Sequence, residues 1–204
     1  MNGLQIINAE GIIESENHPF APSFTADAFE KGYEKRVEAY ASASLTEYNK
    51  SLFGVSMVNG WRITPSSYVG LGVGYEYSDV LYVIRMKGNM STPQHMFPVY
   101  GEYKFNFKPE SVSSPFLVVD AGWVFNSNGE DKEGISTKSA YGLMSSARFG
   151  IDISVGNDLR VTCSVGPRIQ HIRITEKYSR LGKWEYRFLH DYFTSVCAHV
   201  GLIF

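Results

Sequence analysis

Charged residues and one histidine recur at alternate positions in several segments of this chain, and their side chains are the ones that could do chemistry. They are Arg36, Glu38, Glu102, Lys104, Asp120, Arg148, Asp152, Arg168 and His199. Carboxylates beside guanidiniums could form a salt-bridged cluster or a route for protons or ions. Either role requires a fold that brings together residues far apart in the sequence.

The elements that must position these residues show strand periodicity. In the carboxy-terminal segment, Tyr192, Val196, Val200 and Phe204 share one face, and His199 lies on the other. A period of two with one mostly apolar face predicts a β-strand. The same alternation predicts strands over 34–45, 52–63, 67–77, 95–107, 115–125, 140–155, 159–174 and 190–204. The chain is therefore expected to be all-β.

The connectors between these segments differ in length in a regular way. Short, turn-forming connectors at 64–66, 108–114 and 156–158 alternate with connectors at 46–51, 78–94, 126–139 and 175–189, three of which are long. Short turns at one end and long loops at the other are typical of outer-membrane barrels. Within the long connectors, 80–84 and 184–188 alternate again, so we expect them to extend strands beyond the bilayer.

Composition narrows the function classes. The 204 residues carry a net charge of −2, which gives no basic footprint for nucleic acid. No apolar run approaches the ~20 residues of a membrane helix, so a membrane protein of this composition would have to be a barrel. Aromatic residues are frequent, at 14%. We expect interfacial positions for Trp61, Tyr75, Phe105, Phe107, Trp123, Phe125, Tyr192 and Phe204.

Several short motifs carry a family resemblance. They include Gly54-Val-Ser56, Asn59-Gly-Trp61, the run 69–75 (VGLGVGY) and the run 98–104 (PVYGEYK). With these motifs the chain resembles small Gram-negative outer-membrane β-barrel proteins, the OmpX/OmpA-like barrels. The resemblance implies an eight-stranded antiparallel up-and-down transmembrane β-barrel over 33–204. The amino-terminal residues depart from the family pattern, and we expect 1–32 to be a periplasmic extension. The chain shows no signal peptide, which we expect to have been removed before insertion into the bacterial outer membrane.

The functional expectation is a non-enzymatic, surface-exposed scaffold or interaction protein whose lumen is filled by paired charges. We expect a monomer in a lipid bilayer, with an extracellular partner at the long loops, no nucleic acid, no cofactor, no metal and no catalytic residue.

Two alternatives remain open. One is a lipid-modifying enzyme, of the acyltransferase or deacylase type found in the PagP and PagL families, which would use His95, His171 or His190 with Ser91, Ser179 or Asp191. The other is a soluble lipocalin-like barrel, which would place the apolar face inside.

Overall fold

Nine strands build the part of the chain that the computed structural model describes, which covers 29–45, 51–84, 88–127, 138–139, 142–155, 159–180 and 183–204. The strands are β1 (Gly32–Ser44), β2 (Ser51–Thr64), β3 (Ser67–Ile84), β4 (Gly88–Asn106), β5 (Ser113–Ser127), β6 (Lys138–Ser139), β7 (Gly142–Ser154), β8 (Arg160–Arg180) and β9 (Lys183–Ile203). No helix that could span a membrane occurs within these ranges.

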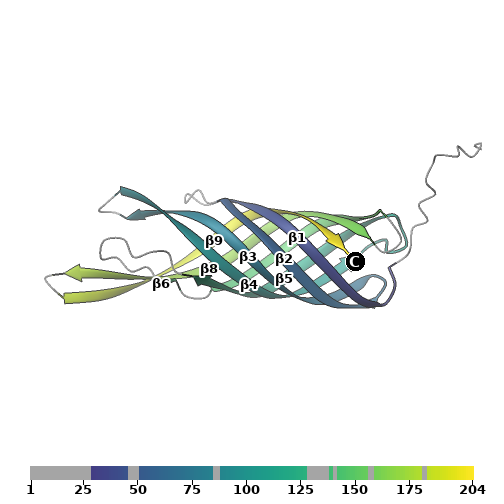
Figure 1. Cartoon of the computed structure of the whole chain (residues 1–204), viewed down its shortest axis with the longest axis horizontal. Helices are drawn as coiled ribbons and strands as arrows, with labels where there is room; N and C mark the ends of the chain where they lie inside the picture. Colours follow the sequence, from purple (N-terminus) through teal and green to yellow (C-terminus); the bar gives the residue numbers. More distant parts are fainter. Residues whose placement is uncertain are drawn as a thin grey trace, which may run out of the picture.

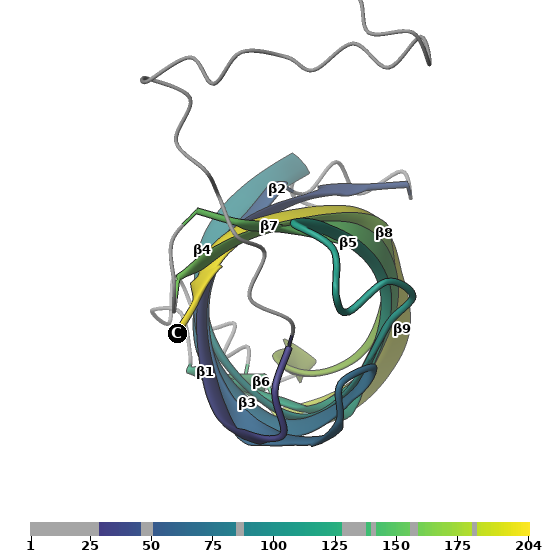
Figure 2. The ribbon, with the colours of Figure 1, turned by 90° about the vertical axis from the view of Figure 1, so that its right-hand side faces the viewer.

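The strands form one closed antiparallel sheet. Its order is β8-β7-β5-β4-β3-β2-β1-β9, and β9 pairs back onto β8 to close the ring, while the short β6 adds to β8 outside it. Consecutive long strands are neighbours throughout, which is the up-and-down topology. The predicted eight-stranded antiparallel barrel is therefore confirmed, and Figure 2 shows the ring of strands end-on.

The two ends of the barrel differ. The turn end carries the connections β2–β3, β4–β5 and β7–β8 together with the carboxy terminus, and the loop end carries the others. At the loop end two hairpins, β3–β4 and β8–β9, project beyond the ring (Figure 1). β8 has 21 residues and β7 has 13, so at ~3.3 Å per residue β8 is longer by roughly 26 Å.

These hairpins correct the boundaries drawn from the sequence. β3 ends at Ile84 and β4 begins at Gly88, so most of the expected connector 78–94 is paired strand. β8 and β9 pair as far as Arg180 and Lys183, so most of the expected connector 175–189 is also paired strand. Glycine, proline and serine in these connectors favoured loops, but cross-strand pairing prevails. The expected extension of strands through 80–84 and 184–188 is confirmed.

Side chains alternate strictly between the two faces of the barrel wall. In β7 every second residue from Gly142 to Ser154 is buried and those between are exposed or half-buried. Exposed large apolar residues lie on the outside of every long strand, for example Leu71, Val119 and Val165. Among the residues whose burial is described, most of the charged ones are buried inside. This is the inverse of a soluble lipocalin-like barrel, so that alternative is wrong.

Candidate functional site

Arg148 lies at the centre of the barrel interior, where it meets carboxylates from three other strands. Its Nη2 is 2.9 Å from Asp120 Oδ2 and 3.3 Å from Glu102 Oε2, and its Nη1 is 3.3 Å from Glu38 Oε2. The strands involved are β7, β5, β4 and β1. Only 1% of the Arg148 side chain is exposed, so these ion pairs are screened little by water.

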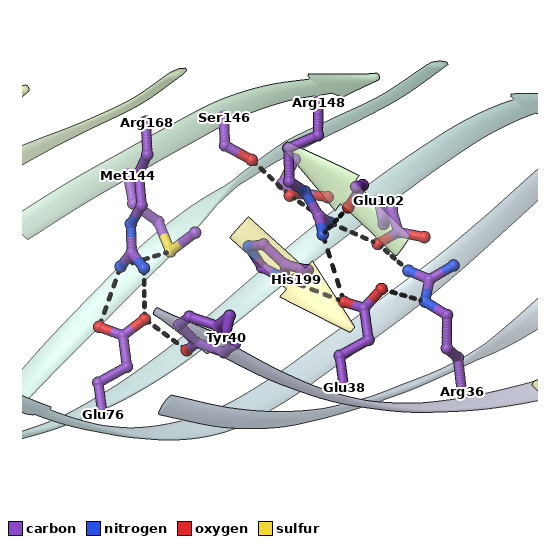
Figure 3. A network of polar contacts seen from close by, with 12 residues as sticks. Arg36, Glu38, Tyr40, Glu76, Glu102, Met144, Ser146, Arg148, Arg168 and His199 are labelled. Atoms are coloured by element: carbon purple, nitrogen blue, oxygen red, sulfur yellow. Dashed lines mark hydrogen bonds and ion pairs between the residues drawn. The ribbon is translucent and has the colours of Figure 1, made fainter. Parts of the chain in front are cut away.

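Arg36 completes this central cluster. Its Nε is 2.9 Å from Glu38 Oε1, and its Nη2 pairs with Glu102 Oε2. His199 Nδ1 is 3.4 Å from Glu38 Oε2, and its ring stacks on that of Tyr40 at 4.6 Å between centroids. Figure 3 shows Arg36 and Arg148 approaching the same acids from different walls. The cluster therefore holds three carboxylates against two guanidiniums.

A second pair lies toward the loop end and is also drawn in Figure 3. Two nitrogens of Arg168 donate hydrogen bonds to the Glu76 carboxylate, at 2.5 Å and 3.0 Å. The Tyr40 hydroxyl donates a hydrogen bond of 2.6 Å to Glu76 Oε1, and Arg168 Nη2 also donates to Gln170 Oε1 at 3.1 Å. A two-nitrogen contact of this kind fixes orientation as well as charge.

A third cluster lies toward the turn end. Lys104 Nζ is 2.7 Å from Asp152 Oδ2, and the Asn106 amide donates to the same oxygen at 2.8 Å. Arg62 donates to Glu34 Oε2 through two nitrogens, at 2.8 Å and 2.6 Å. Arg62 also donates to Asn106 Oδ1 at 3.1 Å, which joins the two ion pairs.

Charge is balanced inside the barrel. Among residues whose side chains are described, the buried acids are Glu34, Glu38, Glu76, Glu102, Asp120 and Asp152, and the buried cations are Arg36, Arg62, Lys104, Arg148, Arg160 and Arg168. Six of each sign give a formal interior charge of zero. Isolated charges in so dry a space would be costly, whereas close pairs with additional hydrogen bonds offset that cost.

All nine charged or histidine positions expected from the sequence line the interior. The expected set omits three residues that complete ion pairs there, Glu34, Arg62 and Glu76. Each has the inward parity of its strand, so alternation alone was a sufficient signal for them. Several of these acids and cations come from non-neighbouring strands, for example Glu76 with Arg168 and Glu38 with Arg148, and alternation gives no signal for that pairing.

The eight aromatic residues expected at the membrane interfaces all lie exposed on the barrel exterior. Two of the histidines considered for catalysis have aromatic neighbours there. His95 Nδ1 is 2.6 Å from the Tyr75 hydroxyl, and the His171 ring lies 5.0 Å from that of Tyr192. The side chains of Ser91, Ser179, His190 and Asp191 fall outside the described residues. In the described ranges, no three His, Cys, Asp or Glu side chains gather as a metal site would require.

Comparison with known proteins identifies the fold. No family model and no curated protein matches the sequence. Among solved structures, the outer membrane protein OprG from Pseudomonas aeruginosa aligns with a TM-score of 0.67 at 11% identity, over 86% of this chain and 96% of that one. AlkL, solved in DMPC lipid bilayers, gives 0.60 at 12% identity, over 94% and 96%. Neisserial surface protein A gives 0.54 at 15%, over 84% and 96%.

These similarities show that the chain has the fold of small outer-membrane β-barrels. The wall agrees with that fold physically, because its exterior is apolar and its interior is charged. In water such an exterior would expose a continuous apolar surface, whereas in a bilayer it meets lipid. Fold and surface together support a location in a bacterial outer membrane.

Proposed function

We propose that the protein is a non-enzymatic outer-membrane scaffold that presents two hairpins, β3–β4 and β8–β9, at the outer surface of the cell. The observation that carries this proposal is the asymmetry of the barrel ends. The turn end has short connections, whereas the loop end extends two paired hairpins beyond the ring. Since ~9–11 tilted residues suffice to cross a bilayer, strands of 18 to 21 residues reach well past it.

In this proposal the interior charges are structural. Balanced ion pairs from opposite walls hold the cross-section and fill a lumen that, in an eight-stranded barrel, is only wide enough for side chains. The network then serves as a plug, and the hairpins bind an extracellular partner. A monomer suffices for this role, because the β8–β9 pairing closes the ring without a second chain.

The orientation is tested with epitope tags in cells. A tag after Gly182, between β8 and β9, is expected to bind antibody on intact cells. A matched tag after Ser66, in the β2–β3 turn, is expected to bind only after the outer membrane is permeabilised. Binding to the Ser66 tag on intact cells, with none to the Gly182 tag, would contradict the proposed orientation.

The non-enzymatic part is tested separately with purified, refolded protein. Vesicles of lipopolysaccharide and phospholipid are incubated with the protein, and the lipids are then measured by mass spectrometry. We expect no change in acyl-chain number relative to vesicles without protein. Loss or transfer of an acyl chain that is absent in a His95→Ala variant would favour the lipid-modifying alternative instead.

A further inference from the structure

Phe29 precedes the first strand, yet it is one of the buried residues of the barrel, with 6% of its surface exposed. Its backbone N–H donates a hydrogen bond of 3.1 Å to the carbonyl of Pro109, in the turn between β4 and β5. In Figure 2, which views the turn end, the purple start of the described chain lies within the outline of the ring. Phe29 therefore lies at the mouth of the barrel, inside the ring of strands.

The ring of Phe29 lies between two cations. The guanidinium carbon of Arg62 is 3.7 Å from the ring centroid, and that of Arg160 is 3.5 Å from it. Arg62 comes from β2 and Arg160 from β8, which are three steps apart around the closed sheet, through β1 and β9. The phenyl ring thus contacts guanidiniums from two well-separated walls, both well within the ~6 Å of the ring centroid at which cation–π contacts form.

Phe29 contacts, through Arg62, the turn-end ion cluster formed by Glu34, Arg62, Lys104, Asn106 and Asp152. Arg62, which contacts the ring, also donates hydrogen bonds to Glu34 and Asn106, and the Asn106 amide donates one to Asp152. The side chain of Ser114, which accepts a hydrogen bond of 3.1 Å from Asn106, is fully buried there. Phe29 is therefore joined to this cluster through Arg62, at the mouth of the barrel.

We propose that Phe29 is a stopper that closes the turn end of the barrel, held by its ring between Arg62 and Arg160. The described residues that lead into β1, 29–31, are then a docked strap at the barrel mouth. Release of the strap opens the turn-end ion cluster to water and to small solutes. The inference rests on the fold alone, so it stands or fails independently of the surface role proposed above.

The test is the reactivity of a cysteine placed behind the stopper. Ser114→Cys is introduced into the full-length protein, and its labelling by a water-soluble maleimide is followed on folded protein. Mass spectrometry of the peptide that contains position 114 keeps the native Cys163 and Cys197 out of the measurement. We expect slow labelling with Phe29 and about tenfold faster labelling with Phe29→Ala. A tenfold change in rate is equivalent to ~1.4 kcal/mol, which is the scale of desolvated cation–π contacts.

Two further variants distinguish the effect of the aromatic ring from the effect of side-chain volume. Phe29→Tyr keeps an aromatic face and is expected to protect position 114, whereas Phe29→Leu fills the space without one and is expected to label nearly as fast as Phe29→Ala. Protection by leucine equal to that by phenylalanine would overturn the role of the ring.

A control reports on general loosening of the barrel. The control substitution is Ser42→Cys. Ser42 lies in the half of the interior nearer the loop end, where it pairs with Cys197 and Leu52 across the neighbouring strands. Its labelling is expected to be the same with Phe29 and with Phe29→Ala. Equal acceleration at positions 42 and 114, or none at either, would overturn the stopper.

Discussion

Replacing Arg148 by methionine is expected to destabilise the barrel mainly through Asp120. After the change, Glu38 and Glu102 still have Arg36 as a partner. Asp120 keeps only the hydroxyl of Ser146, which donates to Asp120 Oδ2 at 2.6 Å, among the contacts described. The central cluster would then hold three carboxylates and one guanidinium, so a buried acid loses its counter-charge.

The magnitude follows from the burial of these groups. Removing one partner of a buried pair costs about 3–5 kcal/mol, because the other charge stays desolvated. Arg148→Met should therefore lower the free energy of unfolding by that amount. Adding Asp120→Asn removes the stranded charge and restores the interior balance of the two signs. We expect the double variant to be more stable than the sum of the two single effects implies, by ~2 kcal/mol.

The measurement is urea unfolding in detergent micelles, followed by the heat-modifiable migration of the folded barrel on gels. The control cycle combines Arg148→Met with Asp152→Asn. These residues are four apart on β7, roughly 13 Å at strand spacing, and no described contact joins them. Their effects should add within ~0.5 kcal/mol. Coupling near zero for Arg148 with Asp120 would refute the reasoning, because it would mean that water solvates each charge separately.

Two further predictions concern the two faces of the wall. Val119→Arg places a charge on the lipid-facing side, where Val119 is 45% exposed, and should lower the free energy of unfolding by ~2–4 kcal/mol near the membrane midplane. In the same unfolding assay, the control Val119→Leu should change this free energy little. Equal stability of the two variants would contradict the lipid contact. Gly72→Ala would bring a Cβ within 2.3 Å of the Tyr100 ring inside the barrel and should cost ~1–3 kcal/mol by overpacking. Gly101→Ala is its matched control, since its nearest atom would be 3.9 Å away; a larger loss for Gly101→Ala would contradict the packing assigned to Gly72.

Much of the wall follows from the sequence because alternation is a local property. The parity of Val119 and Asp120 places them on opposite faces of the wall without knowledge of any other strand. The direction of the apolar face is not local. The exterior position of residues such as Leu71 and Val165 in the closed barrel shows that it points outward.

The pairing inside the lumen could not be derived in the same way. Glu76 meets Arg168, which lies 92 residues away, and their meeting depends on the stagger of β3 against β8 around the whole ring. Phe29 is a different case. It belongs to no alternating segment, so no periodicity indicates its burial. Its position depends on two arginines on separate walls, which only the closed barrel brings together.

The backbone ladders and the interior side chains stabilise different features of this barrel. Each ladder joins only neighbouring strands, so it fixes register but leaves the cross-section free to flatten. Two of the ion pairs join strands that have no ladder between them: Glu76 on β3 with Arg168 on β8, and Glu38 on β1 with Arg148 on β7. β3 and β8 lie four steps apart in a ring of eight strands, directly across the lumen. Such contacts act as cross-braces, and a brace of paired charges resists both collapse and expansion because either movement separates the pair.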